Sequence, residues 1–125
     1  MDGQRHRKPI YWVGSSRDDL KEFPDEVKRV MGFAFHLAQA GAKHVGAKPL
    51  KGFKGAGVLE VVEEHDGNAY RGVYTVRFAE VIYVLHAFQK KSKKRIATPK
   101  SDIDLVKEQL KRAEQDYEQR SKPRG

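Results

Sequence analysis

The sequence predicts an α+β domain in which an N-terminal helical hairpin packs on a small, twisted, mainly antiparallel sheet, with a further helix at the C-terminus. Three observations predict this class. The chain has 125 residues, the length of one ordinary domain, and 38% of them are hydrophobic, which is enough for a modest core. Apolar residues recur at helical steps of three and four before residue 41 and after residue 100. Between these segments lie three apolar runs with the spacing of strands.

The N-terminal residues predict a flexible arm, a short strand and a short helix. Residues 1–9 are polar and basic without periodicity, which is typical of a flexible arm. The run Ile10–Val13 is apolar and β-prone, and a glycine and two serines end it. Ser16 is then a candidate N-cap for a helix that ends at Phe23, because Pro24 disfavours the helical conformation in the residue before it.

A second helix is predicted to begin at Pro24, whose missing N–H is harmless in a first turn. Its apolar positions recur at helical steps: Val27, Val30, Met31, Ala34, Leu37 and Ala38. Gly41 is a natural C-cap, so the two helices form a hairpin joined at the proline. The five glycines and four lysines from Gly41 to Gly57 predict a loop.

Three predicted strands form an antiparallel meander. They are Val58–Glu64, Tyr70–Phe78 and Val81–Phe88, with a strong turn signal, Asp66-Gly67-Asn68, between the first two. In the second strand, alternation places Tyr70, Tyr74, Val76 and Phe78 on one face, and Arg71, Val73, Thr75 and Arg77 on the other. The third strand is nearly continuous in apolar residues, as a central strand is. Its alternation places four residues on one face: Ile82, Val84, His86 and Phe88.

The last predicted helix runs from Lys100 to Tyr117 and follows Thr98-Pro99. Its narrow apolar stripe consists of Ile103, Val106, Leu110 and Ala113. Residues 119–125 carry no such pattern and are expected to fray. The sequence therefore predicts one domain over residues 10–118.

The charge of the chain predicts a polyanionic partner. There are 25 basic and 17 acidic residues, which give a net charge of +8. The excess lies mainly in residues 89–125, and five of the six residues from Lys90 to Arg95 are basic. A cluster anchored directly after a strand can aim its cations at phosphates. The alternative interpretation is a solvated loop between the strand and the last helix.

Composition and motifs exclude several kinds of chemistry. The absence of cysteine excludes disulfides, thiolate zinc sites and cysteine nucleophiles. The five histidines lack metal-ligand spacing, and no phosphate-binding glycine motif or serine-hydrolase motif is present, so neither a metal nor a cofactor is expected. No apolar run approaches a bilayer span and no signal-peptide core is present, which predicts a soluble cytoplasmic protein without a membrane partner.

Two arginines and one histidine in the predicted strands are candidates for chemistry. A mid-strand arginine is costly to bury without an anion, so Arg71 and Arg77 each bind phosphate or form a salt bridge. The candidate salt-bridge partners are Glu60 and Glu63. His86 is either a general acid or base near neutral pH or a satisfied core histidine.

Three short motifs lie in and around the predicted strands. They are KPLKG at residues 48–52, Tyr70-Arg71, and LHAFQKKS at residues 85–92, which a basic loop and Thr98-Pro99 follow. Together with the helical hairpin and the last helix, they resemble the RelE/ParE superfamily of bacterial type II toxins, and most closely its HigB-like, phage-related branch. The resemblance runs from Ile10 to Tyr117, and the strand ending in HAFxKK is its most specific part.

The resemblance implies a RelE-like α+β fold and a function. A basic concave face of the sheet would enter the ribosomal A site and cleave mRNA without a metal, as a ribosome-dependent endoribonuclease. The implied partners are the ribosome, mRNA and a neutralising helix-turn-helix antitoxin of the HigA-like kind. The free toxin is then expected to be a monomer and the toxin–antitoxin complex an oligomer.

The resemblance also implies roles for residues at matching positions. Arg71 would stabilise the transition state, and Lys90 and Lys91 would bind phosphate or take part in proton transfer. His86 matches the histidine of the motif, and this residue either contacts the substrate or only packs in the core. The residues predicted to contact RNA are Lys51, Lys54, Arg77, Phe88, Lys93 and Lys94. For Phe88 the alternative is that it closes the core.

One position departs from the family pattern. Members often read Glu-Leu-Arg where this chain has Glu60-Val61-Val62, so a basic side chain is missing. The departure implies weaker catalysis, or compensation by Lys54. The superfamily also includes gyrase-directed members that are not nucleases. The alternatives to the nuclease are therefore a ParE-like gyrase-directed toxin and a catalytically degenerate domain that binds an antitoxin or nucleic acid.

Overall fold

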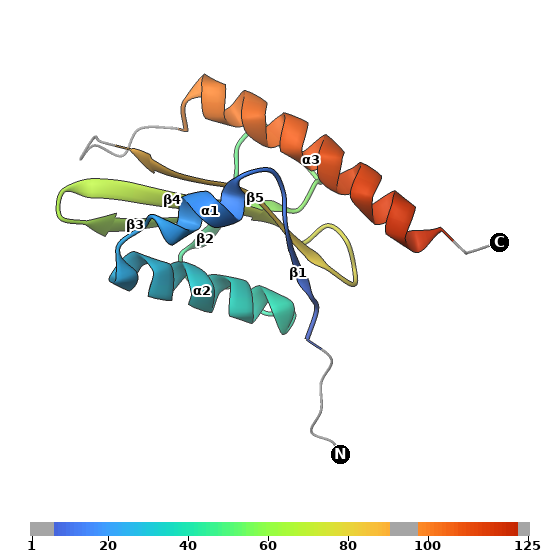
Figure 1. Cartoon of the computed structure of the whole chain (residues 1–125), viewed down its shortest axis with the longest axis horizontal. Coiled ribbons are helices and arrows are strands. Elements are labelled where there is room, and N and C mark those ends of the chain that lie inside the picture. The colour runs from blue at the N-terminus through green and yellow to red at the C-terminus, as the bar shows by residue number, and fades with distance from the viewer. Residues whose placement is uncertain (1–6, 91–97, 123–125) are drawn as a thin grey trace, which may run out of the picture.

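The computed structural model describes residues 7–90 and 98–122 and confirms the α+β class. The arrangement is consistent with a RelE-like fold (Figure 1). Along the chain the elements are β1 (Ile10–Trp12), α1 (Ser16–Lys21), α2 (Asp25–Gln39), β2 (Ala47–Pro49), β3 (Val58–His65), β4 (Asn68–Thr75), β5 (Ile82–Lys90) and α3 (Lys100–Ser121).

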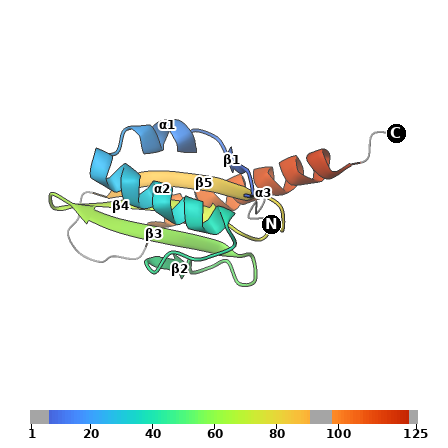
Figure 2. The same ribbon diagram turned by 90° about the horizontal axis from the view of Figure 1, so that it is seen from below.

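The strands described form one mixed sheet in the order β1-β5-β4-β3-β2. The strands β2 to β5 pair antiparallel, as the meander predicts, whereas β1 pairs with β5 in parallel. The helices α1 and α2 cover one face of this sheet, and α3 packs across the opposite face (Figures 1 and 2). The layers are therefore two helices, a sheet and one helix, with β4 and β5 in the centre.

A hydrophobic core lies on each face of the sheet. The first core lies on the side of α1 and α2. Its fully buried side chains include Val27, Met31, Ala34, Tyr74, Ile82 and Val84. Those of the second core, on the α3 side, include Val73, Leu85, Val106 and Ala113. Because β4 is buried on both faces, any charged side chain on it lies in the protein interior and needs a partner there.

Two predictions for the N-terminal half are wrong in detail. Ser15 rather than Ser16 occupies the N-cap position of α1. Ser16 is buried instead, and its hydroxyl donates a hydrogen bond to the carbonyl oxygen of Val84 at 3.2 Å. The segment predicted as a loop after Gly41 contains β2, which pairs with β3. This strand has only three residues and ends in Pro49, so its pairing depends on β3 and leaves no strand pattern in the sequence.

Backbone contacts and helical structure continue outside residues 10–118 at both ends of the described chain. The amide N–H of Lys8 donates to the carbonyl oxygen of Gln39 at 3.1 Å, and the Gln39 side chain donates back to the Lys8 carbonyl at 2.7 Å. Of the arm predicted over residues 1–9, residues 1–6 lie outside the described residues. At the other end, α3 continues through Ser121 instead of ending at Tyr117, so residues 119–121 are helical.

The second predicted strand ends early. β4 stops at Thr75, and Phe78 packs in the core on the α3 side, with its ring centroid 5.4 Å from that of Tyr83 and 4.5 Å from that of Tyr117. The prediction that Phe78 shares a face with Tyr74 is therefore wrong. Strand alternation no longer applies once the chain has left the sheet.

A register shift in β5 decides the face on which His86 lies. Val73 pairs with His86 whereas Tyr74 pairs with Val84, so Leu85 is an extra residue in β5. An extra residue of this kind reverses the alternation beyond it. His86 therefore lies on the α3 side of the sheet, and the prediction that it shares a face with Val84 is wrong. The apolar run of β5 contains no glycine or proline to mark the irregularity.

A polar cluster fixes the C-terminal half of α3 to the sheet. Asp116 accepts hydrogen bonds from the Tyr83 hydroxyl and from Nε of Arg120, each at 2.6 Å, and the Arg120 guanidinium lies 3.9 Å from the ring centroid of Tyr11. These contacts account for the additional helical turn. Although α3 has 22 residues, no helix in the described part of the chain is long and apolar enough to cross a membrane.

Asp116 is expected to make the stability of the fold depend on pH in the acid range. The hydrogen bond from Tyr83, with a smaller contribution from Arg120, holds the pKa of Asp116 below its ordinary value. The resulting stabilisation is complete above the unfolded-state pKa of about 3.9 and is lost as the pH falls through the lower folded-state pKa. Asp116→Asn should therefore lower the melting temperature at neutral pH and converge with the wild type at strongly acid pH. Parallel melting curves across this range test the prediction, and a constant difference contradicts it.

Tyr74 is expected to destabilise the fold through its hydroxyl group. The side chain is fully buried, its hydroxyl has no hydrogen-bond partner among the described residues, and burial raises the pKa of Tyr74 to about 12. Removing an unsatisfied buried hydroxyl recovers its desolvation cost, so Tyr74→Phe should raise the free energy of unfolding by about 1 kcal/mol. Tyr83→Phe is the matched control and should lower it, because that hydroxyl donates to Asp116. Urea denaturation measures both changes, and a destabilised Tyr74→Phe contradicts the prediction.

Candidate functional site

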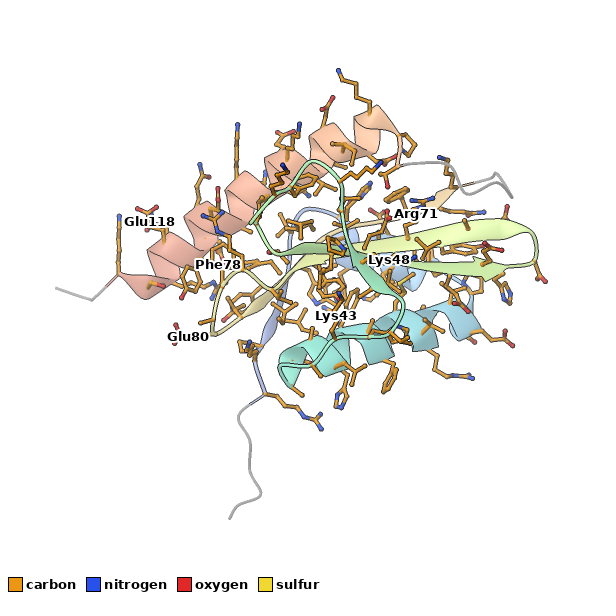
Figure 3. The ribbon with its side chains drawn as sticks, turned by 180° about the vertical axis from the view of Figure 1, so that it is seen from behind. Lys43, Lys48, Arg71, Phe78, Glu80 and Glu118 are labelled. Carbon is orange, nitrogen blue, oxygen red and sulfur yellow. The ribbon has the colours of Figure 1, made fainter. Side chains whose placement is uncertain are left out.

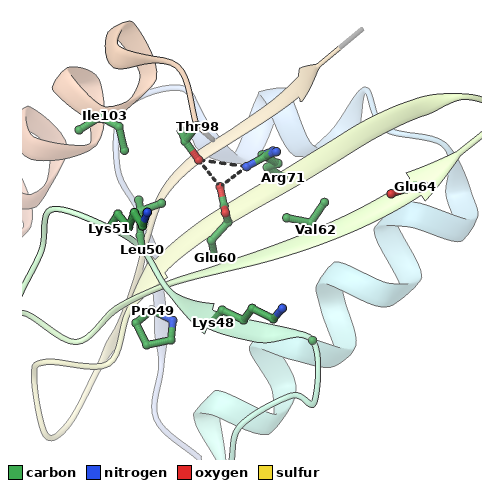
Figure 4. Close-up of a pocket in the computed structure, with 11 residues that line it drawn as sticks. Lys48, Pro49, Leu50, Lys51, Glu60, Val62, Glu64, Arg71, Thr98 and Ile103 are labelled. Atoms are coloured by element: carbon green, nitrogen blue, oxygen red, sulfur yellow. Dashed lines mark hydrogen bonds and ion pairs between the residues drawn. The ribbon is translucent and has the colours of Figure 1, made fainter. Parts of the chain in front are cut away.

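A cleft of about 600 Å³ opens on the α3 side of the sheet, between β2, β3 and the start of α3 (Figure 4). Its polar lining comes from Lys48, Lys51, Glu60, Glu64, Arg71 and Thr98. Its apolar lining includes Pro49, Leu50, Val62 and Ile103. Even-numbered residues of β3 point into the cleft because its odd-numbered Val61 faces the core beneath α2. A cleft with apolar walls and a few polar groups is typical of a ligand site.

Arg71 is held at the cleft by a carboxylate and a hydroxyl. The residue is 6% exposed, and its Nη1 atom lies 3.1 Å from Oε2 of Glu60 and 3.0 Å from Oγ1 of Thr98. The Thr98 hydroxyl donates in turn to Oε2 of Glu60 at 2.7 Å, which closes the triangle drawn in Figure 4. Of the two partners weighed for Arg71, Glu60 forms the salt bridge. The ion pair satisfies a charge on a strand that is buried on both faces.

His86 lies on the same face of the sheet as Arg71. Its Nε2 atom is 2.8 Å from Oδ1 of Asp102 in the first turn of α3. The ring also stacks on Phe88, with ring centroids 4.6 Å apart and an interplanar angle of 20°. Phe88 is paired with Arg71 across β4 and β5. His86 is thus neither solvated nor surrounded only by apolar atoms: it is a buried polar residue with a carboxylate partner.

The lysines predicted to contact RNA or phosphate are in four different situations. Lys51 and Lys48 both line the cleft (Figure 4), whereas Lys54 is exposed but is not part of the lining. Lys90 ends β5 and pairs with Ala69, which places it on the face of Arg71. The predicted contacts at Lys91, Lys93 and Lys94 lie outside the described residues.

Arg77 does not join the site. It follows the end of β4 and forms an ion pair with Glu114 of α3, and its guanidinium lies 5.7 Å from the ring centroid of Phe78. Phe78 lies toward the other end of the sheet from Arg71 in Figure 3. The two arginines that sequence alternation placed on one strand face are therefore in different environments.

Sequence reasoning named Glu60 as a candidate salt-bridge partner of Arg71, but it missed Thr98 and Asp102 as residues of the site. Thr98 stood out only as part of the Thr98-Pro99 motif, and Asp102 carried no signal. Its contact with His86 depends on the docking of α3 and on the extra residue in β5, which no local pattern shows. Among the described residues, no group of three or more histidine and acidic side chains could hold a metal ion.

Comparison with models of protein families gives a match over most of the chain. A family model described as "Phage derived protein Gp49-like" matches residues 18–111, a range that includes Glu60, Arg71, His86 and Asp102. Searches of the curated proteins and of the solved structures found no significant match.

Proposed function

The chain belongs to the family of phage-derived Gp49-like proteins, and on this premise we propose that it is the toxin of a type II toxin–antitoxin system and cleaves mRNA on the ribosome. The family is associated with RelE-like toxin proteins, and the α+β fold agrees with that association. Membership of this family therefore favours a toxin of a toxin–antitoxin system. The ribosome dependence, the RNA target and the HigB-like branch are parts of the proposal.

The observation that carries the proposal is that Arg71 and His86 lie on the same face of the sheet. Strands β4 and β5 place both on the sheet face that carries the cleft. Asp102 of α3 is the partner of His86, and Thr98, just before α3, contacts Arg71. A guanidinium and an imidazole on one sheet face provide a cation for a phosphate and a group that can transfer a proton. The cleft volume lies within the range of roughly 300–1,000 Å³ that is usual for ligand sites.

In the proposed reaction, the 2′-hydroxyl of RNA attacks the adjacent phosphorus. The O2′–P bond forms and the P–O5′ bond breaks, so one proton leaves O2′ and one is added to O5′. Arg71 stabilises the charge that develops on the phosphoryl oxygens. His86 transfers one of the two protons, and Lys90 and Lys91 bind phosphate or take part in the other transfer.

The ion pair of Arg71 with Glu60 has two consequences for this reaction. It holds the guanidinium in place before RNA binds, which lowers the entropic cost of ordering a long side chain. It also places a carboxylate where a phosphate would approach, and the cleft lining as described carries three basic and two acidic side chains. Strong RNA binding then needs further cations, and residues 91–95 contribute four more in the sequence.

The same ion pair favours a second candidate function. Because Glu60 already satisfies Arg71, and Val62 stands beside it where the family pattern has arginine, the site also suits a ParE-like gyrase-directed toxin or a degenerate domain. Pulse labelling after induced expression in bacterial cells separates the candidates. The nuclease stops incorporation of labelled methionine before that of thymidine. A gyrase-directed toxin reverses this order, and a degenerate domain leaves both unchanged.

The proposed partner is a helix-turn-helix antitoxin of the HigA-like kind. Co-expression of such a protein, encoded beside this chain, is expected to restore growth. Restored growth supports the toxin part of the proposal for either target, so the labelling experiment still decides between RNA and gyrase.

A further inference from the structure

We infer that Asp102 is a positioning residue that fixes the tautomer and the orientation of the His86 ring for proton transfer. The inference rests on the function proposed above and assigns a role to a residue of α3. Asp102 Oδ1 lies 2.8 Å from Nε2 of His86. Within residues 7–90 and 98–122, this carboxylate is the one side chain that forms a hydrogen bond or ion pair with the ring.

The contact determines where the imidazole carries its hydrogen. An ionised carboxylate can only accept, so a hydrogen bond at this distance requires the hydrogen on Nε2 of His86. In the neutral ring, Nδ1 then carries the lone pair. Nδ1 is therefore the atom that accepts or returns a proton in the proposed reaction, while Nε2 stays bound to Asp102.

The contact also fixes the direction of the ring. Stacking on Phe88 restricts the plane of the imidazole but does not distinguish its two edges. The hydrogen bond to Asp102 selects one edge, so the two contacts together leave a single orientation. The His86 side chain is 11% exposed and that of Asp102 is 23% exposed, so solvent competes little for this hydrogen bond.

The start of α3 links this pair to Arg71. Thr98 contacts Arg71 and Glu60, and four residues later Asp102 contacts His86. The backbone between them is fixed, because the amide of Asp102 donates to the carbonyl oxygen of Pro99 at 3.0 Å. Fully buried Val106 anchors the next turn of the helix. The first turn of α3 and the residues that lead into it thus contact both candidate catalytic side chains.

The test compares Asp102→Asn with a matched control, Asp104→Asn. Both replace a carboxylate by its isosteric amide in the first turns of α3. Asp104, however, is 57% exposed, and its ion pair within the described part of the chain is with exposed Lys100, at 3.8 Å. Cleavage of a translated mRNA should fall by about 10–100-fold in Asp102→Asn, the usual effect of losing the group that orients a functional histidine. It should stay within about twofold of the wild type in Asp104→Asn, because an exposed ion pair contributes little. Asp102→Glu, which keeps a carboxylate, should restore part of the rate.

Two further measurements distinguish a role of Asp102 in positioning the His86 ring from a role in stabilising α3. Nitrogen-15 NMR of the His86 ring should show the Nε2–H tautomer in the wild type and in Asp104→Asn, and a changed tautomer population in Asp102→Asn. In a His86→Ala background, Asp102→Asn should cause no further loss of cleavage, because the two residues act as a unit.

The outcomes distinguish the inference from the proposed function. If the wild type leaves translated mRNA intact, the proposed nuclease function is wrong and the inferred role in proton transfer is overturned with it. If the wild type cleaves and His86→Ala does not, but Asp102→Asn cleaves like Asp104→Asn, the inference alone is overturned. An additive loss in the His86→Ala background, with the wild-type tautomer kept in Asp102→Asn, overturns it as well.

Discussion

Replacing Arg71 by glutamine should reduce ribosome-dependent mRNA cleavage by about 100-fold or more, because it removes the cation assigned to the transition state. Arg71 lies at the cleft on the same sheet face as His86. Arg77→Gln is the matched control: this arginine pairs with Glu114 outside the cleft, and its loss should leave the cleavage rate unchanged. Rates measured on one translated message, at equal concentrations of folded protein, test the difference.

The stability of the Arg71 variant needs its own measurement. The Glu60 side chain is 13% exposed, so removing its partner buries a carboxylate without a cation and costs about 3 kcal/mol of stability. Arg71→Lys keeps the charge but loses the planar guanidinium, and it should fold and cleave at an intermediate rate. Wild-type cleavage by folded Arg71→Gln would show that Arg71 has only the structural role of pairing with Glu60.

A large effect on stability is also expected at Leu85, the extra residue of β5. Leu85→Ala should lower the free energy of unfolding by about 3 kcal/mol, within the range for a leucine truncated in a close-packed core. Leu85 is fully buried on the α3 side, in the same core as Val73 and Val106. Truncation leaves a cavity beneath the helix that carries Asp102, so cleavage should fall as well.

Leu105→Ala provides the control for this prediction. Leu105 is 37% exposed on α3, so the same chemical change should cost no more than about 0.5 kcal/mol. Urea denaturation of the two variants measures the difference. Equal destabilisation would contradict the assignment of Leu85 to the interior of the α3-side core.

Much of the fold follows from local patterns in the sequence. The apolar spacing of α2, its start after Pro24 and the glycine that follows its end predicted that helix closely. The turn at Asp66-Gly67 fixed the β3–β4 hairpin, because both residues adopt the positive φ angles that such a turn requires. The long apolar run of β5 correctly predicted a central strand. These features depend on residues that are close together in the sequence, so they can be predicted from the sequence alone.

The candidate site was less predictable because its contacts join distant segments. Arg71 and His86 were identified as candidates, but their partners Thr98 and Asp102 lie 27 and 16 residues away along the chain. The face of His86 depends on the irregularity at Leu85, which sequence alternation could not show. The site is therefore a product of how α3 docks on the sheet, and only its basic and aromatic members have a signature in the sequence.

The proposal that this chain is a ribosome-dependent endoribonuclease is tested most directly by mapping RNA 5′ ends. A defined mRNA is incubated with the purified protein in a reconstituted translation system, with and without ribosomes. The proposal predicts new 5′ ends within the coding region only when the message is translated, at positions that occupy the ribosomal A site. Intact message under active translation would contradict it and would direct the next measurement to gyrase supercoiling.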